Sequence, residues 1–200
     1  MKKSFFLALA VLLLASFKPE AGYKVGDKAN DFKLMNIDDK MVSMADYKDA
    51  KGFIVVFTCN HCPFAKKYED RIVALDKKYK PLGYPVIAIN PNDPSQNAED
   101  DFATMKKRAK EKGFTFPYLH DETQATANAY GAKVTPHVFI VKREAGASIV
   151  KYIGAIDDNS DDATKVKEKY VESAVDNLLA GKPVSPDFTK GIGCTVKWKK

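Results

Sequence analysis

Residues 53–71, FIVVFTCNHCPFAKKYEDR, change character halfway along. The first five residues are apolar and β-branched at their centre, which is typical of a buried central strand. After Pro63 apolar side chains recur every three or four residues, which predicts one face of an amphipathic helix. Cys59 and Cys62 stand at this junction, with His61 between them. The stretch therefore predicts a strand, a turn and a helix, with a cysteine pair where the helix begins.

The rest of the chain predicts further strands and helices in alternation. Alternating apolar residues on both sides of an acidic turn predict a β-hairpin over 31–44. By the same patterns we expect helices at 64–79, 99–112, 121–130 and 163–179, strands at 84–90, 138–141 and 149–154, and an extended piece at 114–119. The last two strands are joined by a short turn, which makes them antiparallel neighbours. This order predicts an α/β domain over 24–181, with a mixed central β-sheet, helices on both faces and an added N-terminal β-hairpin.

The N-terminus has the pattern of an export signal. Two lysines at positions 2 and 3 precede a run over 5–17 that is apolar apart from one serine. That length suits the apolar part of a signal peptide and is short for a membrane span. We predict a signal peptide at 1–18, with cleavage as late as residue 22, and a periplasmic or other extracytoplasmic location. A retained N-terminal membrane anchor is the alternative.

The charge of the chain does not indicate nucleic-acid binding. The formal net charge is +6, and it falls to +3 without Lys2, Lys3 and Lys18. Lysines and acidic residues are interspersed along the remainder, with no basic stripe. We therefore expect no nucleic-acid partner, no bound cofactor, and membrane contact only through an uncleaved N-terminal segment.

The chain has three cysteines, Cys59, Cys62 and Cys194. The export signal indicates that they act in an oxidising compartment. Thiols tend to pair in an oxidising compartment, and an odd number leaves one unpaired or engaged in exchange. A disulfide between Cys59 and Cys62 would close a very short loop and would stabilise the fold little. The pair therefore indicates redox chemistry more than a structural crosslink.

A helix start gives such a pair its reactivity. The unpaired N–H groups and the positive end of the helix dipole favour a thiolate over a thiol. We expect Cys59 to be the exposed nucleophile and the shielded Cys62 to release a mixed disulfide by attacking Cys59. A protonated His61 would stabilise the thiolate further, although an exposed loop histidine with no tuning role is also compatible with the sequence.

Several segments together resemble the thioredoxin superfamily. They are VGDKANDFKL at 25–34, VFTCNHC at 56–62 with the proline that follows, AINPND at 88–93, VTPHVFIV at 134–141 and IGCTVKW at 192–198. Over residues 24–200 the chain is similar to the extracytoplasmic redoxin (AhpC/TSA) and TlpA/ResA-like thiol-disulfide oxidoreductases. The resemblance implies a three-layer thioredoxin-like fold, a redox-active disulfide between Cys59 and Cys62, and a cis Pro136 packed against the cysteine pair.

The segment Thr135–Pro136 is the expected substrate-binding element. A cis X–Pro bond costs only about 0.5–1 kcal/mol over trans. It would leave the backbone of Thr135 free to pair with a bound polypeptide in a strand-like contact. An ordinary loop before a strand is the alternative for this dipeptide. His137 points either toward the site or into the sheet.

The chain departs from the family patterns at several positions. Residues 53–57 contain no carboxylate, so water, His61 or a more distant acid must move the proton of the resolving thiol. Peroxiredoxins carry a threonine three residues before the reactive cysteine, where this chain has Val56 before Cys59. Arg71 is the sole arginine close to the pair in sequence. These departures weigh against an efficient peroxidase.

The function that we expect is thiol-disulfide exchange with protein thiols or disulfides, coupled to an upstream electron donor or acceptor. A redoxin-type thiol peroxidase is the first alternative. A Cu(I)-binding or delivery module, using Cys59, Cys62 and His137, is less favoured, because related copper proteins space their cysteines as C-x-x-x-C.

The C-terminal tail, 182–200, is expected to pack on the domain through Ile192 and Trp198. It carries Cys194, the possible third thiol. Cys194 would resolve Cys59, pair with a partner, or be a buried tail residue.

Overall fold

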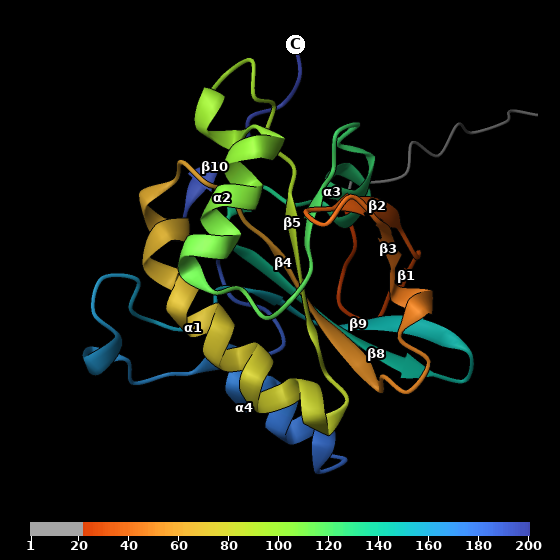
Figure 1. Cartoon of the computed structure of the whole chain (residues 1–200). Coiled ribbons are helices and arrows are strands. Elements are labelled where there is room, and N and C mark those ends of the chain that lie inside the picture. The colour runs from red at the N-terminus through yellow and green to blue at the C-terminus, as the bar shows by residue number, and fades with distance from the viewer. Residues whose placement is uncertain (1–21) are drawn as a thin grey trace, which may run out of the picture.

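The computed structural model describes residues 22–200 (Figure 1). The predicted signal peptide lies outside this range. The strands are β1 (Lys28–Ala29), β2 (Lys33–Asn36), β3 (Met41–Ser43), β4 (Gly52–Phe57), β5 (Val86–Asn90), β6 (Tyr118–His120), β7 (Val134–Thr135), β8 (His137–Glu144), β9 (Ala147–Gly154) and β10 (Cys194–Thr195). The α-helices are α1 (Pro63–Tyr79), α2 (Phe102–Lys112), α3 (Ala125–Tyr130) and α4 (Tyr170–Leu179).

One mixed sheet forms the centre of the fold. Its strand order is β1-β9-β8-β4-β5-β6-β2-β3, with β5 parallel to both β4 and β6. The other neighbours pair antiparallel, including β4 with β8 and the hairpin β2–β3. The mixed sheet and the N-terminal hairpin are therefore confirmed. Strand β1, which pairs with β9 at the opposite edge, was not predicted.

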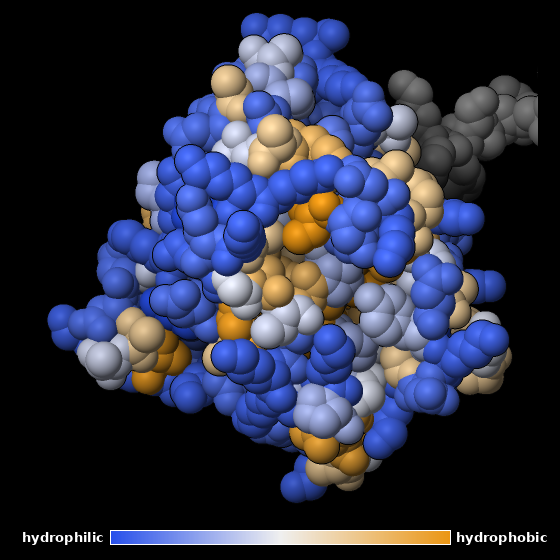
Figure 2. Space-filling view, viewed as in Figure 1, coloured by the Kyte–Doolittle hydropathy of each residue, from blue (hydrophilic) through white to orange (hydrophobic). Residues whose placement is uncertain are grey.

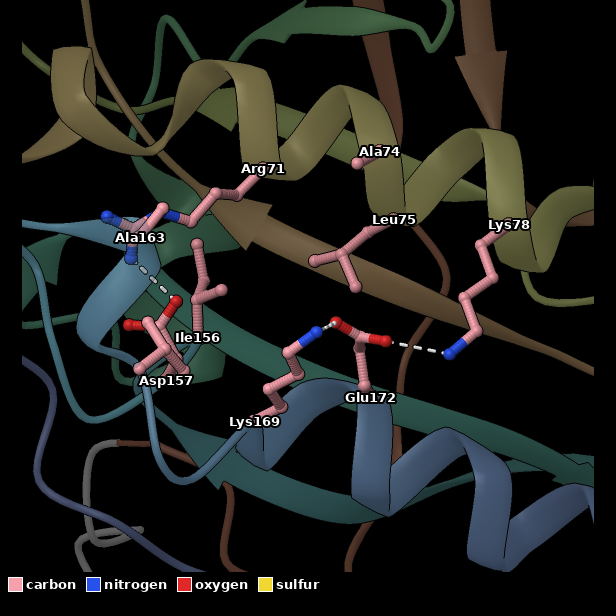
Figure 3. Close-up of a pocket in the computed structure, with 10 residues that line it drawn as sticks. Arg71, Ala74, Leu75, Lys78, Ile156, Asp157, Ala163, Lys169 and Glu172 are labelled. Atoms are coloured by element: carbon pink, nitrogen blue, oxygen red, sulfur yellow. Dashed lines mark hydrogen bonds and ion pairs between the residues drawn. The ribbon is translucent and has the colours of Figure 1, made fainter.

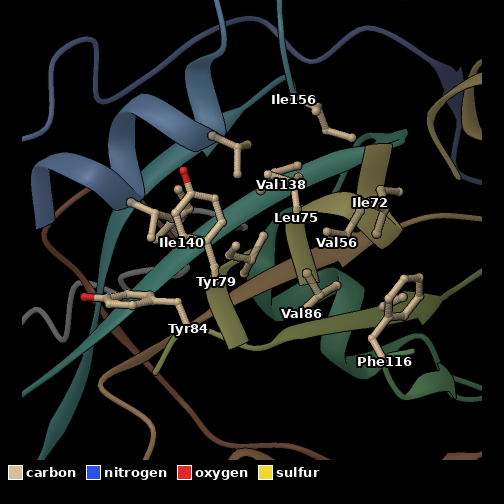
Figure 4. Close-up of a cluster of buried hydrophobic side chains, with 14 of the residues drawn as sticks. Val56, Ile72, Leu75, Tyr79, Tyr84, Val86, Phe116, Val138, Ile140 and Ile156 are labelled. Carbon is tan, nitrogen blue, oxygen red and sulfur yellow. The ribbon is translucent and has the colours of Figure 1, made fainter. Parts of the chain in front are cut away.

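Helices cover both faces of this sheet (Figure 1). Side chains from α1, α2 and α4 join one face of the strands in a buried cluster that includes Tyr68, Ile72, Met105, Val171 and Ile140 (Figure 4). The other face packs against α3 and the N-terminal strands, in a second cluster. Strand β4 is buried along its whole length because it lies between these two clusters. The predicted three-layer arrangement is confirmed.

The last helix is shorter than predicted. Only a 3-10 turn forms over Ala163–Lys165, and α4 begins at Tyr170. The reason is a competing set of hydrogen bonds to Asp158. Its N–H donates to the carbonyl of Glu168 (3.1 Å), and its carboxylate accepts from the N–H of Lys167 (3.0 Å). These contacts hold the chain against the acidic loop instead of in a helix.

The second helix also begins later than predicted, because two turns replace its first residues. A 3-10 turn over Ala98–Asp100 comes first, and Asp101 then caps α2 by accepting the N–H of Thr104. Asp101 is extended, with φ −67° and ψ 161°, so the chain changes direction between the two turns. This change of direction leaves Asp100 fully buried.

Within residues 22–200 no helix is both long and apolar enough to cross a bilayer. The face seen in Figure 2 is mostly hydrophilic, with hydrophobic atoms in small separate areas.

Shortening a side chain on the buried face of β8 should lower the stability of the fold strongly. Ile140 is fully buried between β4 and the helices. Ile140→Ala is expected to lower the free energy of unfolding by about 2–5 kcal/mol, since it leaves a cavity in a packed core. Met41→Ala, at an exposed position on the edge strand β3, serves as the control and should change it by less than about 0.5 kcal/mol. Urea unfolding measures both, and equal effects would contradict this assignment of the core.

Candidate active site

The cysteine pair lies at the junction that the sequence predicted. Strand β4 ends at Phe57 and α1 begins at Pro63, with Cys62 as its N-cap residue. Pro63 occupies the first helical position, where no backbone N–H is needed. Both thiols are free in the structure. The helix therefore presents its N-terminal N–H groups to the cysteine pair.

Thr135 contacts both thiols from across the site. Cys59 Sγ lies 3.1 Å from Thr135 Oγ1. Cys62 Sγ lies 3.2 Å from the Thr135 carbonyl oxygen, to which a protonated Cys62 donates. The bond between Thr135 and Pro136 is cis, as the resemblance implied. The two cysteines and the Thr135–Pro136 segment, separated by more than seventy residues, thus form one site.

The two buried thiols affect each other's pKa. Interaction with Cys59 lowers the pKa of Cys62 to about 4, helped by the side chain of Cys194 and the N–H of Ala65. The same interaction, with burial and the nearby negative charge of Asp100, raises the pKa of Cys59. The contacts with Thr135 favour the opposite distribution of charge, since its carbonyl accepts from a protonated Cys62 and its hydroxyl is free to donate to a Cys59 thiolate. That Cys59 is the nucleophile stays a prediction.

A buried carboxylate, Asp100, holds the loop between the cysteines. Its Oδ1 accepts the backbone N–H of Asn60 at 2.7 Å and that of His61 at 3.2 Å. Its Oδ2 accepts from Asn92 Nδ2 at 2.9 Å. Asp100 matches one of the three alternatives that the sequence left open for moving the proton of the resolving thiol, namely water, His61 or a more distant acid. The Glu-Asp-Asp run that contains it gave no signal that set it apart from a solvated helix start.

His61 is bound to this same carboxylate. Its Nδ1 lies 2.5 Å from Asp100 Oδ2, and only 13% of the side chain is exposed. The histidine is therefore oriented by a buried partner and is not a free loop residue. Cys59, His61 and Asp100 each offer one ligand atom, and these atoms lie within 4.8 Å of one another. Their atoms are of the kinds that bind zinc, and a histidine beside a carboxylate is also a common arrangement for proton transfer.

The C-terminal tail covers the pair. Strand β10 pairs antiparallel with β7, so that Cys194 lies opposite Thr135. Cys194 also packs against Cys59 and Cys62. Two expectations are therefore wrong. Cys59 is not exposed, since only 2% of its surface is accessible, and the backbone of Thr135 is not free, since β10 already pairs with it.

Several hydrogen bonds anchor the tail on both sides of β10. After it, the N–H of Lys197 donates to Asn92 Oδ1 at 2.9 Å, and the Lys197 carbonyl accepts from Gln124 Nε2 at 2.8 Å. Before it, Thr189 Oγ1 accepts the N–H of Ala155 at 3.0 Å. The expected apolar anchors, Ile192 and Trp198, are instead exposed at 40% and 39%. The buried apolar residue of this segment is Val196, whose N–H binds the carbonyl of Lys133.

Comparison with known proteins places this site in a family. The model of the AhpC/TSA family matches residues 25–153. The chain belongs to the AhpC/TSA family. A thiol-disulfide oxidoreductase ResA from Geobacillus thermodenitrificans is 28% identical over 68% of this chain and 74% of that protein.

Solved structures share the fold of this chain. An uncharacterized conserved protein from Geobacillus kaustophilus is 38% identical, covers 90% of this chain and 95% of its own, and has a TM-score of 0.81. A putative thiol:disulfide interchange protein DsbE from Chlorobium tepidum is 24% identical over 63% of this chain and 82% of its own, with a TM-score of 0.53. The fold of this AhpC/TSA member is thioredoxin-like, as predicted.

His137 lies away from the thiols of this AhpC/TSA protein. It is buried at the start of β8, and its ring packs edge-on against Phe139, with centroids 4.8 Å apart. It lines a cavity of about 410 Å³ with Tyr23 and Gly191. Among residues 22–200, the metal-capable group at the cysteines contains His61 and Asp100 and does not include His137. The copper set of Cys59, Cys62 and His137 is therefore not assembled.

Arg71 is also directed elsewhere. Its Nη1 binds Asp157 Oδ2 at 2.7 Å and the carbonyl of Asn159 at 2.6 Å. Arg71 and Asp157 border a cavity of about 260 Å³ between α1 and α4, where Glu172 binds Lys78 and Lys169 (Figure 3). No thiol lines this cavity. Its ion pairs join helices, and Arg71 is not placed to polarise a peroxide at the cysteines.

Because the tail covers the thiols, its docking should limit how fast reagents reach them. A Cβ added at Gly193 would collide with the carbonyl group of Thr135, so Gly193→Ala should loosen β10. A loss of about 1.4 kcal/mol in tail docking would raise the population of the open form about tenfold. We expect iodoacetamide to alkylate the Cys59–Cys62 pair of the reduced protein faster by that factor. Thr195→Ala, at an exposed position on the same strand, is the matched control, and equal rates for the two variants would contradict the covering role.

Buried His137 predicts a loss of stability in mild acid. Burial, with a smaller effect of Lys133, lowers its pKa from 6.5 to about 4. The unfolded chain therefore binds this proton at higher pH than the folded one. The contribution of neutral His137 to the free energy of unfolding is complete above pH 6.5 and is lost as the pH falls toward 4. The total loss is about 3 kcal/mol. Urea unfolding of the wild type should show a steeper decline over this range than that of His137→Asn. If the free energy of unfolding falls equally with pH in both proteins, the lowered pKa of His137 is refuted.

Proposed function

We propose that this protein is a thiol-disulfide oxidoreductase whose Cys59 and Cys62 alternate between dithiol and disulfide. The observation that carries the proposal is the contact of both sulfurs with Thr135, at 3.1 and 3.2 Å, beside the cis bond to Pro136. Two thiols at a helix N-terminus have the arrangement needed for thiolate chemistry. The curated relatives named as thiol-disulfide oxidoreductases support the same reaction class.

The first step joins the substrate to Cys59. The Cys59 sulfur attacks one sulfur of a substrate disulfide as a thiolate, which accepts a hydrogen bond from the Thr135 hydroxyl at 3.1 Å. A Cys59–substrate disulfide forms, and the other substrate sulfur leaves as a thiolate. Cys62 keeps its proton in this step and donates it to the Thr135 carbonyl. The hydrogen bond from Thr135 opposes the rise in pKa that the Cys62 contact and burial cause at Cys59.

The second step releases the substrate. Cys62 gives up its proton and attacks Cys59 Sγ, which forms the Cys59–Cys62 disulfide and expels the second substrate thiolate. The paired His61 and Asp100 lie beside Cys59 and are placed to relay that proton toward the departing sulfur. The reverse sequence of steps oxidises a dithiol substrate. Thr135 and Pro136 orient the substrate sulfur in either direction.

Cellular setting and partners follow from the sequence. We propose that residues 1–18 direct export and that the protein acts outside the cytoplasm, where disulfides persist. Its partners are then protein thiols or disulfides and a donor or acceptor of electrons. A thiol peroxidase is the second candidate, since the AhpC/TSA family model matches the chain. The engagement of Arg71 with Asp157 counts against that reaction.

The reduction potential of the pair tests the proposal. We expect one reversible two-electron couple at Cys59 and Cys62 on equilibration with glutathione or dithiothreitol. Because the hydrogen bonds to Cys62 stabilise the reduced form, its potential should be less negative than the value of about −270 mV of thioredoxin. Peptide mapping after acid quenching measures the oxidised fraction.

Two controls complete this experiment. Cys59→Ser should abolish the Cys59–Cys62 couple, whereas Thr195→Ala should leave its potential unchanged. Absence of a reversible couple in the wild type would overturn the proposed function. Hydrogen peroxide consumption with dithiothreitol, at rates that exceed disulfide exchange, would favour the peroxidase instead.

A further inference from the structure

The tail places a third thiol at the redox pair. In an antiparallel ladder, side chains that lie directly opposite each other project from the same face. Cys194 lies opposite Thr135 in the β10–β7 pair, and the Thr135 hydroxyl already contacts Cys59. The Cys194 side chain accordingly packs on Cys59 and Cys62.

The same placement resembles a bound substrate. A polypeptide that adds a strand beside a cis-proline segment would pair with the backbone of Thr135. Strand β10 occupies that position, and it brings its own cysteine to the sulfur pair. Gly193 allows this close approach, because a side chain there would collide with the carbonyl of Thr135. The tail is therefore built to hold Cys194 at this point.

Cys194 is more accessible to solvent than the other two thiols. Cys59 and Cys62 are buried, at 2% and 0% exposure, whereas Cys194 is only partly buried. A partner thiol in solution meets Cys194 before it meets the pair. An exchange between Cys62 and Cys194 would thus connect the buried disulfide with the surface.

We propose that Cys194 is a third redox thiol, which exchanges with the Cys59–Cys62 disulfide to form a Cys62–Cys194 disulfide. This inference rests on the proposed function and extends it. The Cys194 sulfur attacks Cys62 Sγ, the Cys59–Cys62 bond breaks, and Cys59 leaves and takes up the proton that Cys194 gives up. No electrons are gained or lost in this step. An external thiol then attacks Cys194 Sγ and releases Cys62.

The chemistry of the leaving group favours the last step. Exchange is faster when the departing thiol has a low pKa. Hydrogen bonds, first of all from Cys59, lower the pKa of Cys62 to about 4, so Cys62 leaves readily from Cys194. Burial raises the pKa of Cys194 to about 11, so its own attack on Cys62 should become faster as the pH rises.

Trapping the predicted disulfide tests the inference. Cys59→Ser protein, with the full tail, is incubated with glutathione disulfide as the oxidant. We expect Cys62 to take up glutathione and Cys194 to displace it, so that peptide mapping finds mainly Cys62 linked to Cys194. In Cys62→Ser we expect separate glutathione adducts on Cys59 and Cys194. A folded Cys59→Ser protein that carries only separate adducts or free thiols would overturn the proposal, as would a Cys59–Cys194 bond in Cys62→Ser.

A kinetic measurement separates this proposal from the preceding one. Oxidised wild type, Cys194→Ser and Thr195→Ala are reduced by glutathione, and the rates are compared. We expect glutathione to reduce oxidised Cys194→Ser at least about tenfold more slowly than the wild type. Thr195→Ala should be reduced at the wild-type rate. In Cys194→Ser the Cys59–Cys62 couple should remain reversible, because the proposed function does not need Cys194. Equal rates in Cys194→Ser and wild type would overturn the role of Cys194 alone, whereas loss of the couple in the wild type would remove the proposed function.

Discussion

The buried carboxylate of Asp100 is the contact on which the geometry of the site depends. It accepts backbone N–H groups from both Asn60 and His61, and it also binds the imidazole of His61 and the amide of Asn92. A fully buried carboxylate is costly unless such donors surround it. The loop between the cysteines supplies most of these donors. The need to satisfy the carboxylate therefore fixes the loop, and the fixed loop sets the two thiols against each other.

The segment Val134–Pro136 joins the two halves of the site. Its Thr135 touches both sulfurs on one side, and its backbone forms a ladder with β10 on the other. The tail is held by the same Asn92 that supports Asp100, since Lys197 binds its side chain. The loop, the cis-proline segment and the tail thus share polar partners. A change in any one of them is transmitted to the thiols through directly bonded groups.

Much of the fold was predictable, because it rests on local patterns. The apolar run at 53–57 and the helical spacing after Pro63 gave β4, α1 and the position of the cysteine pair. Errors arose where a tertiary contact replaced a local preference. The helix predicted over 163–179 starts at Tyr170, since Asp158 binds the segment before it. Tail docking was predicted through Ile192 and Trp198, but Val196 and backbone hydrogen bonds perform it.

The sequence by itself determined that the site carries paired thiols, because in a C-x-x-C pair before an amphipathic helix both sulfurs and the helix N-terminus are neighbours along the chain. Only the tertiary structure decided which buried acid lies beside the pair, which groups contact each sulfur, and what covers them. Asp100 is 40 residues from Asn60, and Thr135 is 76 residues from Cys59. Contacts over such separations depend on how the sheet brings its strand ends together, and no local periodicity records that arrangement.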